Sequence, residues 1–241
     1  MSDNLLTLQG VHTHIGAYHI LHGVDLAVPR GELTLLLGRN GAGKTTTLRT
    51  IMGLWHASAG RITFDGQDIT GLDTPRIAGL DVAYVPENMG IFADLTVKEN
   101  MLLAARSARS IARIDQQRLQ WIFSLFPAVE KFWSHPAGKL SGGQKQMLAV
   151  ARAIVEPRRL LIVDEPSKGL APAIINNMID AFAQLKASGV TILLVEQNIN
   201  FAKRLGDTVA VMDNGVVVHA GGMRELAQDE ALQHSLLGLA I

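Results

Sequence analysis

The chain has 241 residues, of which 48% are hydrophobic, so it can form one large α/β domain or two small ones around a packed core. Lys plus Arg and Asp plus Glu number 22 each, and this balance gives no sign of a nucleic-acid partner or an anionic lipid surface. The absence of cysteine excludes disulfides and thiolate metal sites.

The amino-terminal residues MSDNLLTLQG lack the basic and apolar regions of a signal peptide. No apolar run in the chain approaches the roughly 18 residues that a membrane-spanning helix needs. We therefore expect a protein that stays in the cytosol and that serves a membrane, if it does so, from outside the bilayer.

The amino-terminal part predicts strands separated by turns and followed by a glycine-rich loop that opens a helix. Strand, glycine loop and helix together form the first half of a parallel α/β unit. The expected strands cover residues 5–11, 24–28, 33–37 and 61–66, the turn signals lie at 29–31 and 65–66, and the helix runs from Lys44 to Met52.

The pattern becomes mostly helical after an extended segment at residues 82–87 and alternates again from residue 160. We expect an α/β fold in a single domain, residues 1–241, with a core of 1–87 and 156–241 and a helical insertion at 88–155. The expected helices cover 97–125, 142–154, 172–187, 201–205 and the tail from Met223, and the expected strands cover 160–164, 190–196 and a hairpin that turns at Asn214-Gly215.

Residues 38–45, GRNGAGKT, match the phosphate-binding P-loop pattern between an expected strand and an expected helix. Glycines let backbone N–H groups surround phosphate oxygens, the helix N-terminus adds partial positive charge, and lysine adds a full one. The Thr45 hydroxyl can contact Mg²⁺. The predicted ATP-binding residues here are Gly38, Arg39, Asn40, Gly41, Ala42, Gly43, Lys44, Thr45 and Thr46.

Two adjacent carboxylates, Asp164 and Glu165, follow a second apolar run, LLIV. Alone, they would read as an ordinary helix cap and a solvated acid. After a P-loop, the pair instead predicts a Mg²⁺ ligand in Asp164 and a group in Glu165 that polarises the attacking water. A shared cation also offsets the cost of burying two like charges.

Residues 140–144, LSGGQ, precede another helical run and predict a second anion site. A single ATP does not need two such sites from one chain. GRNGAGKT, LSGGQ and LLIVDE, in this order and spacing, resemble the ATP-binding subunit of an ABC transporter over nearly the whole chain. The resemblance implies a P-loop NTPase fold with mixed sheet and helices and an inserted helical subdomain that carries LSGGQ.

The same resemblance implies a head-to-tail dimer in which ATP lies between the P-loop of one subunit and the LSGGQ helix of the other. Ser141, Gly142, Gly143 and Gln144 would then contact ATP that the partner holds. Catalysis would use Lys44 and Glu165, with Gln197 near the γ-phosphate, and the cofactors would be ATP and Mg²⁺.

Two positions depart from the general family pattern, which often has glutamine where this chain has Glu87 and histidine where it has Gln197. These two residues nevertheless fit one subgroup, the ATPases of branched-chain (hydrophobic) amino acid uptake systems and their urea and amide relatives. The chain resembles that subgroup in the segments VPE, IF.DLTV.EN, WIFSLFP, EPS.GLAP and LLVEQN. Glu87 can still contact the Mg²⁺ shell, and the Gln197 amide can donate to the γ-phosphate. Lys168 stands where that subgroup often has an apolar residue.

The resemblance leaves the adenine contact open between Ile15, packing against the base, and Tyr18, stacking on it. It implies a second ATPase subunit, usually a different chain, two membrane-spanning permease subunits and a periplasmic or extracellular solute-binding protein. The site of action would be the cytoplasmic face of the inner membrane, with a permease helix docked near residues 88–95.

Two other functions compete with import. A soluble ABC ATPase acting on DNA or ribosomes usually has coiled coils, a duplicated ATPase half or a basic surface, and this sequence has none of these. A P-loop kinase would need an acceptor site and would leave LSGGQ without a role.

Overall fold

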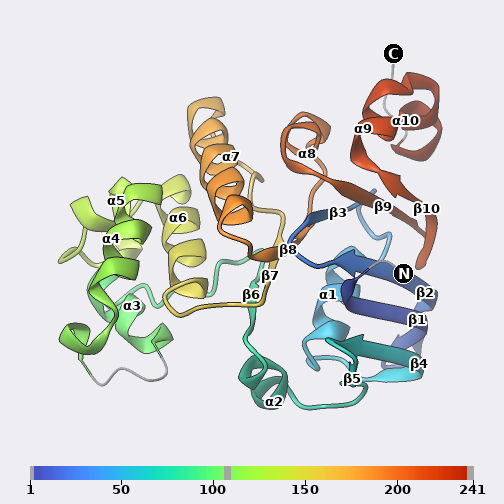
Figure 1. Ribbon diagram of the computed structural model, residues 1–241, viewed down its shortest axis with the longest axis horizontal. Helices are drawn as coiled ribbons and strands as arrows, with labels where there is room; N and C mark the ends of the chain where they lie inside the picture. The colour runs from blue at the N-terminus through green and yellow to red at the C-terminus, as the bar shows by residue number, and fades with distance from the viewer. Residues whose placement is uncertain (1–2, 106–109, 238–241) are drawn as a thin grey trace.

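The computed structural model describes residues 3–105 and 110–237, and the strands of that part form two sheets (Figure 1). One sheet is antiparallel, with the strand order β2-β1-β4-β5. Its strands are β1 (Asn4–Ile15), β2 (Tyr18–Pro29), β4 (Ala57–Phe64) and β5 (Gln67–Asp68).

The other sheet is mixed and has the order β10-β9-β3-β8-β7-β6. Its neighbours are parallel except for the β9–β10 hairpin, which turns as predicted at Asn214 and Gly215, both with positive φ. Its strands are β3 (Leu33–Gly38), β6 (Val82–Val85), β7 (Leu160–Asp164), β8 (Thr191–Val195), β9 (Thr208–Asp213) and β10 (Val216–Gly222).

The mixed sheet is buried on both faces, which explains why β3, β7 and β8 are continuous apolar runs. Alternate residues belong to different cores: Leu35 and Leu37 pack with the helices, whereas Leu36 packs with the antiparallel sheet. The helices of the core are α1 (Lys44–Ile51), α2 (Thr74–Gly79), α7 (Pro172–Ala187), α8 (Ile199–Leu205), α9 (Met223–Gln228) and α10 (Glu230–Leu237).

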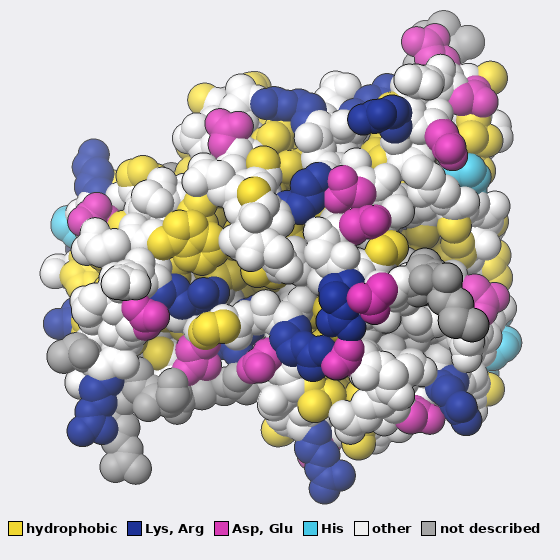
Figure 2. All heavy atoms as spheres, in the orientation of Figure 1, with side chains coloured by type: hydrophobic (Ala, Val, Ile, Leu, Met, Phe, Trp, Pro, Cys, Tyr) yellow, Lys and Arg dark blue, Asp and Glu magenta, His cyan; other side chains and the backbone are white. Residues whose placement is uncertain are grey.

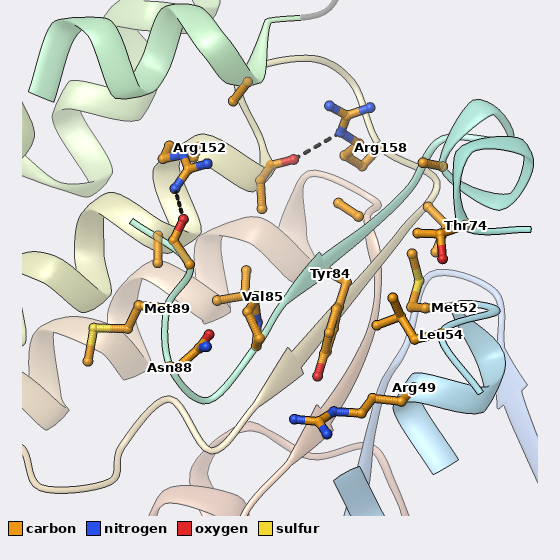
Figure 3. A pocket seen from close by; sticks show the side chains of 18 of the residues that line it. Arg49, Met52, Leu54, Thr74, Tyr84, Val85, Asn88, Met89, Arg152 and Arg158 are labelled. Atoms are coloured by element: carbon orange, nitrogen blue, oxygen red, sulfur yellow. Dashed lines mark hydrogen bonds between the residues drawn. The ribbon is translucent and has the colours of Figure 1, made fainter. Parts of the chain in front are cut away.

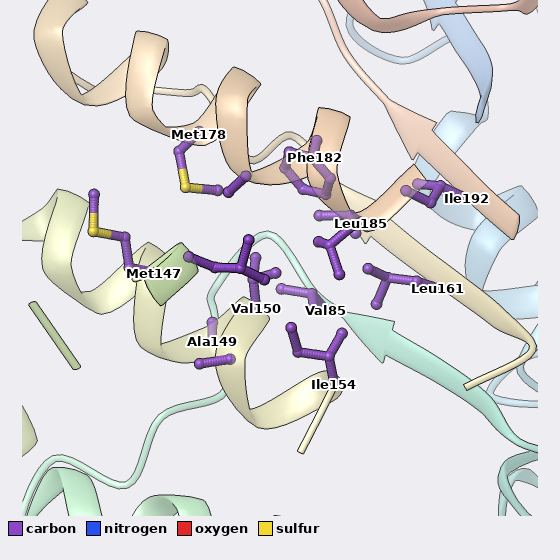
Figure 4. Packing of buried hydrophobic residues seen from close by; sticks show 14 of the residues in the cluster. Val85, Met147, Ala149, Val150, Ile154, Leu161, Met178, Phe182, Leu185 and Ile192 are labelled. Carbon is purple, nitrogen blue, oxygen red and sulfur yellow. The ribbon is translucent and has the colours of Figure 1, made fainter. Parts of the chain in front are cut away.

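In the described part of the chain, four further α-helices lie between β6 and β7 and form the left part of Figure 1. They are α3 (Val97–Ala104), α4 (Gln116–Leu125), α5 (Pro127–Lys131) and α6 (Gly142–Ala153). Figure 4 shows Val150 of α6 and Ile154, which directly follows that helix, near Phe182 and Leu185 of α7, and all four are buried. This packing fixes the LSGGQ helix against the core.

The structure confirms the α/β alternation and corrects several element boundaries. The expected helix 97–125 is two helices: α3 ends at Ala104, and α4 begins where the Asp115 carboxylate accepts the N–H groups of Gln117 and Arg118. The part of that prediction at 106–109 lies outside the described residues. The strand expected at 61–66 ends at Phe64 because Asp65 and Gly66 have positive φ and form the turn.

The expected ranges of several other elements were too short, and the short elements β5, α2 and α5 were missed. β1 and β2 extend to the hairpin turn at residues 16 and 17, and α8 begins at Ile199 because the Asn198 side chain caps it. The helix α2 has one and a half turns and gives no clear periodic signal in sequence.

The visible face in Figure 2 carries acidic and basic side chains side by side, as the equal totals of the two kinds suggest. Within the described part of the chain, the helices are too short or too polar to cross a membrane.

Candidate nucleotide site

The P-loop joins the end of β3 to the start of α1. Gly38 has φ 147°, and a Cβ added there would lie 2.3 Å from the Met212 carbonyl oxygen, so the loop path needs glycine. Gly43 is the N-cap of α1, with φ 104° and no side-chain cap. The first-turn N–H groups of an α-helix have no partner within the helix, so those of α1 suit an anionic ligand.

Lys44 is 5% exposed and lies folded over this loop. Its ammonium donates to the carbonyl oxygens of Gly38 at 2.8 Å and Arg39 at 3.0 Å. Burial lowers the pKa of Lys44, and the carboxylates of Glu165 and Asp164 oppose that shift. The ammonium is therefore held where phosphate oxygens would take over its hydrogen bonds.

Asp164 lies at the end of β7, fully buried, and accepts a hydrogen bond from the Thr45 hydroxyl at 3.2 Å. The Tyr84 hydroxyl, from β6, donates to its other oxygen at 3.5 Å. Burial raises the pKa of Asp164, with a further contribution from the neighbouring carboxylates of Glu165 and Glu87. Burial also raises the pKa of Tyr84 to about 12. A buried carboxylate that accepts hydrogen bonds from two neutral hydroxyls favours a bound cation.

Glu165, next in the chain, has φ 49°, and its backbone N–H donates to the Val195 carbonyl at 3.0 Å. Its carboxylate accepts a hydrogen bond from the Gln197 side-chain amide. That amide also donates to the Asn40 side-chain oxygen at 2.7 Å. Gln197 thus connects the acid after β7 with the P-loop.

Lys168 provides a second contact to the same acid. Its ammonium lies 3.3 Å from Glu165 Oε2 and 2.6 Å from Glu87 Oε1. The hydrogen bonds to Glu87 and Glu165 raise the pKa of Lys168. No motif in the sequence explained a lysine here, and the structure provides a reason: its single positive charge lies beside two carboxylates from separate loops.

A cavity of about 390 Å³ brings these groups together beside the P-loop. Its walls come from β2, the P-loop, the loop after β6 and the loop after β7. They are Ile20, Asn40, Gly41, Gly43, Lys44, Thr45, Thr46, Glu87, Glu165 and Lys168.

Glu196 is a site residue that the sequence did not reveal. It is 2% exposed, and its carboxylate accepts hydrogen bonds from the Ser167 hydroxyl and from the N–H groups of Ser167, Gln197 and Asn198. Burial raises the pKa of Glu196, and these hydrogen bonds oppose the rise. The side chain ties the turn after Glu165 to the segment that carries Gln197.

The residues Ser141 to Gln144 start α6 and do not line the P-loop cavity. Ser141 and Gln144 form a capping box, in which each side chain accepts the other's backbone N–H at 3.3 and 2.9 Å. A Cβ at Gly143 would lie 2.7 Å from Ile174 of α7, whereas one at Gly142 would meet nothing within 4 Å. Gly143 is needed for packing, and Gly142 faces open space.

The adenine candidates lie at the β1–β2 turn, where Ile15 pairs with Tyr18. Ile15 is partly buried, and the Tyr18 side chain is 76% exposed. Neither lines the cavity beside the P-loop, although Ile20, two residues after Tyr18, does. Strand alternation places Tyr18 and Ile20 on one face, a signal that would have identified Ile20 from the sequence.

A second hollow of about 710 Å³ lies between the core and the inserted helices (Figure 3). In Figure 3 the Tyr84 side chain lies on its floor beside Arg49, and Arg152 of α6 donates to the Gly90 carbonyl at 2.6 Å. Among the described residues, Trp55 Nε1 and Arg152 Nε are buried here without a hydrogen-bond partner. This groove, lined also by Met52, Leu54, Val85, Asn88 and Met89, suits an apolar segment with hydrogen-bond acceptors.

Comparison with known proteins agrees with this geometry. The chain is 40% identical over 220 residues to the high-affinity branched-chain amino acid transport ATP-binding protein BraG of Pseudomonas aeruginosa, covering 90% of this chain and 93% of BraG. It is 35% identical to the probable branched-chain amino acid transport ATP-binding protein LivF of Archaeoglobus fulgidus, covering 92% of this chain and 93% of LivF.

A bacterial ABC transporter cassette solved in a dimeric structure superposes with a TM-score of 0.81, 25% identity and coverage of 91% of this chain and 99% of that one. Residues 21–168, more than half of the chain, match the sequence model of the ABC transporter family. The chain therefore belongs to the ABC transporter family, as one of its ATP-hydrolysing, nucleotide-binding subunits.

Proposed function

We propose that this chain hydrolyses Mg·ATP to drive an importer of branched-chain or other hydrophobic amino acids. The observation that carries the proposal is the cavity in which Lys44, Thr45 and Glu165 meet, with Asp164 bonded to Thr45 beside it. The substrate class rests on the similarity to BraG and LivF, whose names give branched-chain amino acid transport.

The residues around the cavity have different roles in phosphoryl transfer. Lys44 and the N–H groups of the P-loop bind phosphate oxygens and stabilise the charge that develops on them. Glu165, held by Gln197, accepts a proton from the attacking water. Gln197 also donates toward the γ-phosphate.

Thr45, Asp164 and Glu87 would hold Mg²⁺, and their oxygen atoms are the ligands that this ion prefers. Bound Mg²⁺ supplies positive charge to the phosphate oxygens. Among the described residues, no group of three or more His, Cys, Asp or Glu could hold a metal ion by itself. A site that takes its remaining ligands from water and phosphates agrees with the usual coordination of Mg²⁺.

The adenine would pack at the β1–β2 turn, against Ile15 or Tyr18. The site would be completed by a partner's LSGGQ segment, and Ser141, Gly142, Gly143 and Gln144 would serve ATP bound to that partner. The dimeric cassette among the similar structures supports this arrangement. We propose a second, different ATPase chain as the partner.

The groove of about 710 Å³ would receive a helix from a permease subunit at the cytoplasmic face of the inner membrane. Its apolar lining and the unpartnered donors of Trp55 and Arg152 support docking there. Two permease subunits and a solute-binding protein would complete the importer. We also propose residues 88–155 as the helical subdomain and 1–87 with 156–241 as the core, a division that the helices between β6 and β7 support.

Uptake in a strain that lacks this gene tests the proposal. Radiolabelled leucine uptake should fall and return with the wild-type gene, but not with a Glu165→Gln variant expressed at the same level. Loss of urea or acetamide uptake with normal leucine uptake would assign the chain to that related group instead. Unchanged uptake of all these solutes would refute import of this class.

A further inference from the structure

Lys168 contacts two carboxylates, those of Glu165 and Glu87. Glu165 is the proposed catalytic base, and Glu87 lies on a loop that borders a different cavity. The Lys168 backbone N–H donates to the Glu165 carbonyl at 3.2 Å, so the lysine belongs to the tight turn that directly follows Glu165. Its side chain is 59% exposed, and Glu165 is only 9% exposed. The contact at 3.3 Å therefore joins a nearly buried carboxylate to a cation at the surface.

Glu87, the other partner of Lys168, lies between two hollows of the molecule. Its side chain lines the P-loop cavity, whereas its neighbours Pro86 and Asn88 line the groove between the core and the inserted helices. A displacement of this loop by a chain bound in the groove would move Glu87 and pull on Lys168. The ion pair thus forms a physical link from the groove to Glu165.

The charges around Lys168 favour this arrangement. The carboxylates of Glu87 and Glu165 face its ammonium. A second ammonium, that of Lys44, lies 4.0 Å from Glu165 Oε1. One oxygen of Glu165 accepts from Gln197, and the other contacts Lys168. A water that Glu165 is to activate must compete with these contacts.

We propose that Lys168 is a positioning residue that restrains Glu165 by tying it to the Glu87 loop, and that movement of this loop releases the restraint. The inference rests on the proposed role of Glu165. In this proposal the lysine acts through its ion pairs with Glu165 and Glu87. It makes the resting rate of ATP hydrolysis low and dependent on what occupies the groove.

ATP hydrolysis by the complex that copurifies with a tagged copy of the chain tests the restraint. At saturating Mg·ATP without transported solute, Lys168→Met should raise kcat by about two- to fivefold, the size of one exposed ion pair, and leave KM within twofold. Glu87→Gln should change kcat less in the Lys168→Met background than in the wild type. Lys168→Arg should restore the wild-type rate, and Lys203→Met, a matched change on the exposed side of α8, serves as the control.

Hydrogen exchange of the nucleotide-free chain gives a readout that does not depend on hydrolysis. Amides of residues 87–90 should exchange faster in Lys168→Met than in the wild type or in Lys168→Arg. An unchanged kcat, or additive effects of the Glu87 and Lys168 variants, would overturn the proposal. A kcat as low as that of Glu165→Gln would also overturn it, in favour of direct contact between Lys168 and phosphate.

These outcomes are separable from failure of the proposed function. If Glu165→Gln hydrolysed ATP at the wild-type rate, Glu165 would not be the base, whatever the amide exchange of residues 87–90. If Glu165→Gln were inactive and Lys168→Met behaved as wild type, only the restraint would be refuted.

Discussion

The Thr45 hydroxyl donates a hydrogen bond to the Asp164 carboxylate at 3.2 Å, across 119 positions of sequence. This contact joins the first turn of α1, which follows β3, to the carboxyl end of β7. In the sheet, β8 lies between β3 and β7. We propose that this hydroxyl and this carboxylate would both serve a Mg²⁺ ion bound with ATP.

Thr45→Val should raise the Mg²⁺ concentration for half-maximal ATP hydrolysis by about 10- to 100-fold, as loss of a group that supports a metal typically does. Valine keeps the shape of threonine and removes only the hydroxyl. Thr45→Ser, which keeps the hydroxyl, should stay within a few-fold of wild type. Equal Mg²⁺ requirements for the valine and serine variants would exclude Thr45 from the metal site.

Gln197→Ala should lower kcat by about tenfold or more, because a hydrogen bond to a charged group contributes about 1.5–3 kcal/mol. A neutral amide does not titrate, so an acid limb in the wild-type rate profile does not arise at this position. Gln197→His should add such a limb near pH ~6.5, the ordinary pKa of histidine. Rate profiles of the three proteins check this, and loss of an existing limb in Gln197→Ala would contradict it.

Glu196 should make stability depend on pH. Because burial raises its pKa in the folded chain above the ordinary 4.5, the folded state binds more protons than the unfolded state in the interval just above that value. The free energy of unfolding that this group contributes is therefore lost as pH rises through the interval.

Glu196→Gln should remove that dependence. The melting temperature of wild type minus that of the variant should fall from pH 4.5 upward and then level off. The amide should also lower stability at all pH values, because its NH₂ group faces the donors of Ser167 and Gln197. A difference that rises with pH would show that the hydrogen bonds outweigh burial.

Gly143 and Gly142 form a matched pair that separates packing from function. Gly143→Ala should cost about 1–3 kcal/mol, since its Cβ would collide with Ile174. Gly142→Ala should leave thermal stability unchanged or slightly raised, because alanine favours helix and meets no atoms there. If residue 142 faces ATP on a partner chain, Gly142→Ala should still reduce hydrolysis, and thermal unfolding together with ATPase rates distinguishes the two effects.

Local patterns in the sequence were sufficient for the central elements of the fold. Glycines and a lysine after the apolar β3 predicted the P-loop, and Asn214-Gly215 predicted the β9–β10 hairpin, because each depends on backbone geometry that few residues allow. The break between α3 and α4 and the short helix α2 were missed, since a continuous apolar period hides the first and the second is too short to show one.

The candidate site was predictable where a residue acts through its own motif. Thr45 and Asp164 were named from separate motifs, and the fold brings them into contact. The ion pairs of Lys168 and the hydrogen bonds of Glu196 were not predictable, because their partners come from distant loops that only the sheet order brings together.

We propose that Glu165 activates water for hydrolysis of ATP held by the P-loop. The most direct measurement is steady-state Mg·ATP hydrolysis by Glu165→Gln in the assembled complex, with ATP affinity measured on the same preparation. We expect hydrolysis to be abolished while ATP stays bound, which gives a longer-lived closed complex. Hydrolysis at the wild-type rate would contradict it.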